Sequence, residues 1–387
     1  MVDLPVNTRV DRPGPADARR VPELDALRGL AALAVVVFHA TPRVLPFGWA
    51  AVDLFFVLSG YLITSIILRH GATPGFLGRF YLRRGLRVWP IYYLAVGAFC
   101  LAGPWLPRHH DWAGLPATLT FTQALPHYWG GHSPAFSSYL GHLWTLAVEE
   151  QFYLLWPAAL VWLGLGRGKA AALAAACVVA SASARGAGMN LSILGGRGDG
   201  LALGGLLAAI LADEGLVARR PAWLSGAFVV TSAAALATLV GLAATVGLTD
   251  RTLHPHRPGL TILAFGLLFF GWVGLTVCHS GRPWLAPLRS RTLRRLGELS
   301  YGLYLYHLPV LMLSTDLARA FGKGGQPLWR VALSLAVCLA VAGLSWRFIE
   351  APILRLKDRF PYLGGSTPSR RHTPPTRAAT PAERTRP

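Results

Sequence analysis

Apolar segments of membrane-spanning length recur along the whole chain and constrain its fold more than any other feature. Of its 387 residues, 53% are hydrophobic and only 14% are charged, whereas soluble domains carry roughly 25% charged residues. A run of about 20 apolar residues is long enough to cross a bilayer as a helix. The sequence therefore predicts an all-α, polytopic membrane protein with about ten transmembrane helices.

The apolar segments divide the chain into three parts. A polar leader (1–22) has no apolar core of the signal-peptide kind. It precedes a membrane domain (23–358), and a basic tail rich in Pro, Thr, Ser and Arg (359–387) is expected to be disordered. The expected helices cover 26–44, 51–68, 88–104, 143–164, 170–187, 198–212, 222–246, 259–278, 297–315 and 327–346.

The distribution of charge orients these helices. Most of the 37 Lys and Arg residues fall in alternate connections and in the terminal segments. Cytoplasmic connections carry the excess of Lys and Arg, so both termini are expected in the cytoplasm. The net charge of +19 lies at helix ends rather than on one soluble face, which argues against a nucleic-acid partner. The four cysteines have no short spacing, and neither a disulfide framework nor a metal site is indicated.

Two ionisable residues stand in the first apolar segment, LRGLAALAVVVFHA. Arg28 and His39 are eleven residues apart, which places them on nearly the same helix face, separated by roughly 16 Å. Ionisable groups inside a membrane usually face a protein interior or a wet cavity. The pair is either an anchor and a structural histidine or part of a site, with His39 expected deep in the membrane.

The second apolar segment, VDLFFVLSGYLIT, carries three polar or small residues. Ser59 and Gly60 favour close helix packing. Asp53 is either a helix-start residue or a substrate contact.

A basic cluster follows in RFYLRRGLRVWP. Arg84 and Arg87 are three residues apart and share a helix face, next to Arg83. The planar guanidinium suits phosphate groups, so the cluster is either ordinary cytoplasmic anchoring or a site for a phosphorylated ligand.

Two adjacent carboxylates enter the apolar segment HLWTLAVEEQFYLLWP. Glu149 and Glu150 point about 100° apart on a helix and are expected to have different partners. Because buried carboxylates in a membrane are costly, a role as general base, or in orienting His39, is favoured over stabilisation of a helix start.

Weaker candidates lie elsewhere. In RGDGLALGG, Arg197 and Asp199 are expected to pair with each other. In SYGLYLYHLP, Tyr301 and His307 are possible substrate contacts, although a packed pair of His307 with Tyr304 is equally compatible with the spacing. The long outer connection 105–142 contains five histidines, among them His109, His127 and His132, and is expected to be an interfacial loop.

Seven of these segments, in order, resemble the acyltransferase 3 family of bacterial integral-membrane acyltransferases. They are ELDALRGLAALAVVVFHA, DLFFVLSGYLIT, FYLRRGLRVWP, HLWTLAVEEQFY, RGDGLALGG, SYGLYLYHLP and FIEAPILRL, and together they span roughly residues 22–357. The family pattern of a basic residue, ten residues and a histidine falls on Arg28 and His39. Its paired arginines fall on Arg84 and Arg87, and its acidic motif on Glu149 and Glu150.

The resemblance implies transfer of an acyl group, typically acetyl, from acyl-CoA to a hydroxyl. The phosphates of the coenzyme would bind Arg28, Arg84 and Arg87. Acyl-CoA would be a co-substrate, and no bound cofactor is expected. His39 would accept the acyl group or act as base, with Glu149 or Glu150 assisting. The expected location is the bacterial plasma (inner) membrane, in contact with lipid.

The acceptor implied by the resemblance is a cell-envelope glycan, a glycolipid or a secreted small molecule such as a macrolide. Many glycan-modifying members carry a C-terminal secreted domain that this sequence does not show, which favours the latter two. A polytopic transporter is the alternative function, but transporters tend to show inverted repeats and paired broken helices. Neither is evident in the sequence.

Overall fold

The structure, a computed structural model, is helical wherever it is described. It describes residues 21–108, 110–123, 125, 136–189, 192–219, 221–246, 258–322 and 327–362. Within these ranges the one β-type pairing is an isolated bridge between His110 and Ser137. The prediction of an all-α protein is confirmed for this part of the chain.

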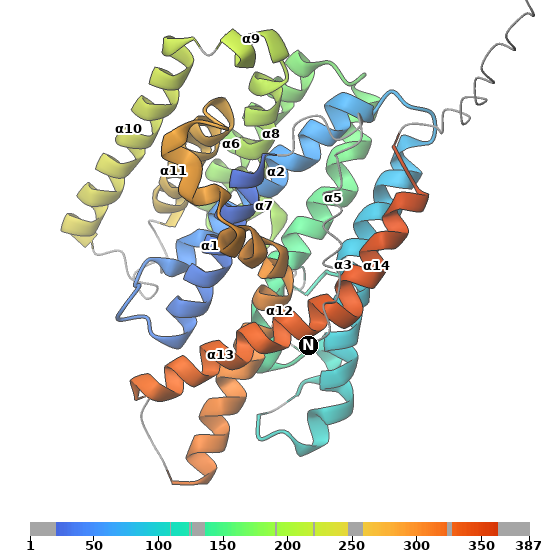
Figure 1. The fold of residues 1–387 in the computed structure, drawn as a ribbon, viewed down its shortest axis with the longest axis vertical. Helices are drawn as coiled ribbons and strands as arrows, with labels where there is room; N and C mark the ends of the chain where they lie inside the picture. Colours follow the sequence, from blue (N-terminus) through green and yellow to red (C-terminus); the bar gives the residue numbers. More distant parts are fainter. Residues whose placement is uncertain are drawn as a thin grey trace, which may run out of the picture.

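Each of the ten expected helices has a counterpart among the described residues, and the long helices run side by side (Figure 1). These are α1 (Pro22–Ala40), α2 (Ala51–His70), α3 (Phe76–Ala102), α5 (Trp144–Trp162), α6 (Arg167–Gly186), α8 (Asp199–Leu211), α10 (Ala222–Val246), α11 (Pro258–Cys278), α12 (Arg291–Ala320) and α13 (Leu328–Ser345). Short helices are α4 (Leu115–Leu119), α7 (Leu194–Arg197), α9 (Glu214–Arg219) and α14 (Ala351–Arg355).

Five helical segments of the described chain are long and apolar enough to cross a membrane. They cover Gly48–His70, Phe76–Trp105, Ala222–Thr245, Gly259–Cys278 and Leu328–Arg359. Outside this set, α1 carries Glu23, Asp25 and Arg28 in its first two turns, and α8 is apolar but shorter. The chain is thus a membrane protein by its helices, whereas the expected total of about ten spans stays a prediction.

Two helices are longer than their apolar segments predicted. α3 begins at Phe76 instead of residue 88, and α12 runs from Arg291 to Ala320 instead of 297–315. Arginine and leucine are strong helix formers, so the helix continues where the apolar run ends. The arginine cluster of α3 therefore lies within a helix rather than at its edge.

α1 and α12 make an unusually close contact through paired glycines. A Cβ atom on Gly297 would lie 2.1 Å from the carbonyl oxygen of Asp25, and one on Gly29 would lie 2.6 Å from the backbone nitrogen of Gly297. From this contact, ten residues lead to His39 on α1 and ten lead to His307 on α12. The two helices run in the same direction from this contact, and ten residues give the same rise along each. The two imidazole rings therefore meet, with centroids 5.0 Å apart.

α2 and α8 are in backbone contact at the second glycine pair. A Cβ atom on Gly60 would lie 1.9 Å from the carbonyl oxygen of Leu201, and one on Gly204 would lie 2.1 Å from that of Val57. The close helix approach expected at Gly60 is confirmed. These contacts hold α2 in place with its polar residues turned toward neighbouring helices.

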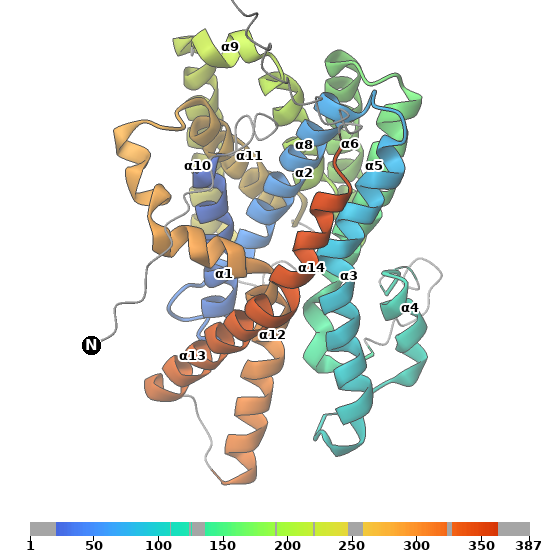
Figure 2. The ribbon, with the colours of Figure 1, turned by 45° about the vertical axis from the view of Figure 1, so that its right-hand side comes forward.

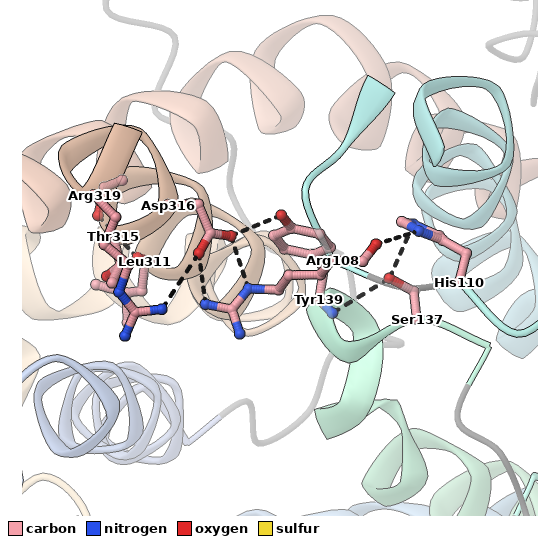
Figure 3. A network of polar contacts seen from close by, with 9 residues as sticks. Arg108, His110, Ser137, Tyr139, Leu311, Thr315, Asp316 and Arg319 are labelled. Atoms are coloured by element: carbon pink, nitrogen blue, oxygen red, sulfur yellow. Dashed lines mark hydrogen bonds and ion pairs between the residues drawn. The ribbon is translucent and has the colours of Figure 1, made fainter. Parts of the chain in front are cut away.

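An ion-pair network ties the outer connection to the end of α12 (Figure 3). Arg108 donates two hydrogen bonds to Asp316, at 2.7 and 2.8 Å, and the hydroxyl of Tyr139 donates a third, at 2.8 Å. Burial acts to raise the pKa of Asp316, but these bonds outweigh it and lower the pKa below its usual value. Burial and the bond to Asp316 raise the pKa of Tyr139 to about 12. The expected loop residues His109, His127 and His132 lie outside the described residues.

The segment after α14 packs against the start of α3, beside which it runs in Figure 2. Arg83 donates to the carbonyl oxygen of Phe360 at 2.9 Å, and the ring of Tyr362 stacks on His70, with centroids 5.3 Å apart. The expected disorder from residue 359 onward is therefore wrong for 359–362, because these aromatic and backbone contacts fix them. Residues 1–20 and 363–387 are outside the described chain.

Candidate active site

A cavity of about 70 Å³ lies between α1, α2, α3, α5 and α12. Five of the predicted site residues line it, although they come from four separate helices: Arg28, Arg84, Arg87, Glu149 and Tyr301. The remaining polar or aromatic lining residues are Ser59, Thr145, Tyr153, Ser300, Tyr304, Phe55 and Phe56.

Three guanidinium groups converge on this cavity. Arg84 lies over the ring of Tyr153, 4.1 Å from its centroid, and Arg28 pairs with Asp25 at 3.6 Å. Arg87 makes no hydrogen bond or ion pair with any described residue, which leaves its planar donors available to an anion. The expected shared face of Arg84 and Arg87 is present, and it is the face that borders the cavity.

Glu149 is the one carboxylate among the described residues that line the cavity. The hydroxyl of Ser59 donates a hydrogen bond to its Oε1 atom at 2.5 Å. Ser59 was expected only to pack between helices, and the structure shows that it holds a carboxylate. Even with Asp25 counted, cations outnumber carboxylates here, so the cavity favours an anionic ligand.

Glu150 faces away from the cavity. Its Oε2 atom accepts a hydrogen bond from Nε1 of Trp89 at 2.9 Å. The expectation that the adjacent glutamates have different partners is confirmed, because about 100° of helix rotation separates them. The proposed catalytic role of Glu150 finds no support in its position.

The end of the cavity is formed by hydroxyl groups. Thr145 and Tyr304 share a hydrogen bond between their side-chain oxygens, and the Tyr304 hydroxyl also donates to the carbonyl oxygen of His142 at 3.3 Å. Tyr301 lines the same cavity, but its hydroxyl donates to the carbonyl oxygen of Val88 at 2.9 Å. Tyr301 therefore presents ring rather than hydroxyl to a ligand.

His39 lies in the last turn of α1 and is exposed. α1 ends at Ala40 instead of the expected residue 44, and the depth of His39 in the membrane stays a prediction. Thr41 precedes Pro42, and the residue before a proline disfavours helical geometry. The Nδ1 atom of His39 bonds to the carbonyl oxygen of Val35 at 2.9 Å.

Two buried histidines lie between His39 and the cavity. The ring of His307 is 5.0 Å from that of His39 and 4.9 Å from that of His142. His307 is completely buried and does not line the cavity. The sequence left a substrate contact and a packed pair with Tyr304 equally open, and the burial of His307 beside Tyr304 agrees with packing.

Asp53 has a structural partner. It pairs with Arg197 at 3.0 Å, while Asp199 pairs with Arg185 at 2.7 Å, and all four residues are buried. Arg197 and Asp199 were expected to pair with each other, but each faces a different neighbouring helix. Asp53 does not line the cavity but forms an ion pair between helices, and its alternative role as a substrate contact stays a prediction.

The sequence comparisons agree with this arrangement. Residues 21–347 match the family described as acyltransferase domain. The chain belongs to the acyltransferase 3 family. Every residue of the cavity and all three stacked histidines fall inside the matched range.

Relatives in this acyltransferase family are longer than the chain. The protein YrhL of Bacillus subtilis is 33% identical over 369 residues, covering 87% of this chain and 55% of the relative. The peptidoglycan O-acetyltransferase OatA of Listeria monocytogenes is 29% identical over 356 residues, covering 86% of this chain and 56% of the relative. The chain thus spans about half the length of the curated relatives it matches. No solved structure matches it.

Five residues of the site were not predicted to contact a ligand: Ser59 and Tyr304, which were considered for packing, and Tyr153, Thr145 and His142, which received no role. Two signals were available. Tyr153 follows Glu149 by four residues and so shares its helix face. His142 opens the same HLWT segment that leads into the glutamates.

Proposed function

We propose that this chain is a membrane-bound O-acyltransferase that moves an acyl group, most simply acetyl, from acyl-CoA to a hydroxyl. One observation carries the proposal. α1 presents an arginine-lined cavity near one end and an exposed histidine at the other, roughly 16 Å apart. A cytoplasmic anionic donor and an acceptor on the opposite face would meet along this helix.

The cavity suits part of a coenzyme A thioester. Arg28, Arg84 and Arg87 supply planar donors for phosphate, and aromatic rings cover the rest of the lining. A cavity of about 70 Å³ admits a few water molecules or one narrow portion of a donor, rather than a whole coenzyme. The nucleotide part would remain on the cytoplasmic side while the long pantetheine arm reaches toward His39.

His39 is the residue on which the chemistry depends in this proposal. Its Nδ1 atom bonds to the carbonyl oxygen of Val35, so in a neutral imidazole the lone pair that can take a proton or an acyl group is on Nε2. In that tautomer, His39 acts either as a base toward the acceptor hydroxyl or as a transient acyl carrier. Glu149 would balance the charge of the arginines rather than orient His39, since Ser59 and the arginines surround it.

The proposed setting is the bacterial plasma (inner) membrane, crossed by about ten helices, with both termini in the cytoplasm. The excess of Lys and Arg in alternate connections supports this orientation. Lipid surrounds the helices, and acyl-CoA and a hydroxyl-bearing acceptor are the remaining partners.

For the acceptor, we propose a cell-envelope glycan or glycolipid, with a secreted small molecule as the second candidate. The name of the Listeria monocytogenes relative, a peptidoglycan O-acetyltransferase, supports the glycan. Mass spectrometry of envelope glycans and secreted metabolites from a deletion strain would separate these classes. An acetylated species that is lost on deletion and restored by the wild-type gene identifies the acceptor.

Donor binding is tested by the double substitution Arg84→Ala and Arg87→Ala. In membranes supplied with labelled acetyl-CoA, we expect the donor KM to rise at least tenfold, because charge-assisted bonds to phosphate are lost. Arg79→Ala is the matched control, since Arg79 lies on α3 but bonds to the carbonyl oxygen of Tyr362. An unchanged donor KM in the double variant would mean that Arg84 and Arg87 anchor the helix at the membrane surface and do not bind the donor.

A further inference from the structure

Three imidazole rings in tilted and edge-to-face contact, together called the histidine stack, lead from the exposed end of α1 into the protein. His39, His307 and His142 follow one another with centroid separations of 5.0 and 4.9 Å. His39 is exposed, whereas His307 and His142 are buried. The stack therefore begins at the surface and ends inside.

The protonation state of each ring follows from its backbone partner. A carbonyl oxygen only accepts hydrogen bonds, so the ring nitrogen facing it carries the proton. On this ground Nδ1 of His39 donates to Val35, Nδ1 of His307 donates to Tyr304, and Nε2 of His142 donates to Leu305 at 3.2 Å. The second nitrogen of each neutral ring is then an acceptor.

The two buried acceptors are unsatisfied. Nε2 of His307 and Nδ1 of His142 have no hydrogen-bond partner among the described residues. Buried polar atoms are nearly always paired, and an exception in a cluster of titratable groups points to use rather than to packing. Two neighbouring lone pairs of this kind are suited to receive and pass on a proton.

The inner end of the stack touches the cavity. The ring of His142 lies 5.4 Å from that of Tyr304, and one hydroxyl of the hydrogen-bonded pair Thr145 and Tyr304 donates to the other while the second donates to the carbonyl oxygen of His142. Both hydroxyls also line the arginine cavity. Ring contacts from His39 through His307 to His142, and from His142 to Tyr304, thus lead to the cavity.

We propose that His307 and His142 form a proton path between His39 and the cavity. This inference rests on the proposed acyl transfer. In that reaction the acceptor O–H bond and the thioester C–S bond break, and a C–O bond and a thiol S–H bond form. His39 takes the hydroxyl proton at the outer end, and the thiolate needs one as its coenzyme withdraws toward the arginines. The stack carries that proton inward, so atoms and charge balance without a further reactant.

Chemical rescue tests the path. We expect His307→Ala to lower kcat by about a hundredfold while the donor KM changes less than threefold, because proton transfer typically contributes that much. Imidazole added to the assay should enter the space left by the ring and restore at least a tenth of the wild-type kcat. His307→Gln keeps bulk and hydrogen bonding but cannot shuttle a proton, and it should stay as slow as His307→Ala.

The matched control is His279→Ala, which removes an imidazole whose Nδ1 atom also bonds the carbonyl oxygen four residues earlier, at 3.1 Å. It should keep wild-type kcat and show no response to imidazole. Recovery of kcat in His307→Gln, or absence of imidazole rescue in a His307→Ala protein of wild-type thermal stability, would show that the ring only packs. Absence of acyl transfer in the wild-type protein would instead overturn the proposed function, so the two failures are distinct.

Discussion

Tyr304 occupies the point where the arginine cavity meets the buried histidines. Its hydroxyl bonds with Thr145 and its ring lies 5.4 Å from that of His307. One side chain therefore borders both the proposed donor pocket and the proposed proton path. The orientation of the Tyr304 hydroxyl depends on its hydrogen bond with the hydroxyl of Thr145.

Removal of that oxygen should impair the reaction. We expect Thr145→Val to lower kcat, because the Tyr304 hydroxyl loses a buried partner, and to lower the free energy of unfolding by about 1–3 kcal/mol. Thr145→Ser keeps the hydroxyl and should retain wild-type kcat. Turnover of labelled acetyl-CoA and thermal unfolding of both variants check this, and equal kcat in Thr145→Val and wild type would contradict it.

At this scale the sequence predicted the charged groups of the cavity better than its neutral ones. Arg28, Arg84, Arg87 and Glu149 stand out because an ionisable group in an apolar segment requires a reason. Asp53 stood out equally, yet its partner on another helix makes it structural. Which polar residue faces the cavity depends on helix packing, and periodicity within one helix does not contain that information.

At the scale of helices, the α1–α12 contact sets the geometry of the histidine stack. The paired glycines allow the two backbones to touch, and ten residues of parallel helix then bring His39 over His307. A larger residue at the glycine contact would push the helices apart along their whole length. The site at the outer end thus depends on a contact roughly 15 Å away.

Gly297→Ala tests this dependence. The added methyl group would lie 2.1 Å from a backbone oxygen, so we expect the unfolding free energy to fall by about 1–3 kcal/mol and kcat to fall with it. Gly226→Ala on α10 is the control, because its Cβ atom meets nothing within 4 Å. Thermal unfolding and turnover should separate the two variants. Equal unfolding free energy and equal kcat in the two variants would mean that the close contact of α1 and α12 affects neither stability nor turnover.

Helix existence was predictable from the sequence, and helix ends were less so. Hydrophobic length located all ten long helices, whereas α3 begins twelve residues before its apolar segment because arginine sustains a helix. Pro42 signals the end of α1 at Ala40, but the prediction followed the apolar residues beyond it and extended the helix to residue 44.

At the scale of the whole molecule, the network around Asp316 joins the outer connection to the helical body. The bidentate pair with Arg108 and the bond from Tyr139 attach the described ends of this connection to α12, on which His307 lies (Figure 3). The short distances predict that this attachment persists at neutral pH.

Its pH dependence follows from the lowered pKa of Asp316. A carboxyl group whose pKa is lower in the folded protein stabilises the fold above its unfolded value of about 3.9, and this contribution is lost as pH falls through the folded value. We expect the unfolding free energy of wild type to exceed that of Asp316→Asn by about 1 kcal/mol at neutral pH, and this difference to shrink as the pH falls below about 4. Thermal unfolding across this range measures it, and a difference that grew on acidification would refute the assignment.

The central claim is that His39 mediates acyl transfer from a donor held at the arginine cavity. Its most direct test supplies labelled acetyl-CoA to the cytoplasmic face of inverted membrane vesicles that contain wild type, His39→Ala or His279→Ala. The account predicts that wild type and His279→Ala transfer label to the acceptor, while His39→Ala, present in the membrane at equal amount, loses at least about a hundredfold in rate. Near wild-type turnover by His39→Ala would contradict the claim.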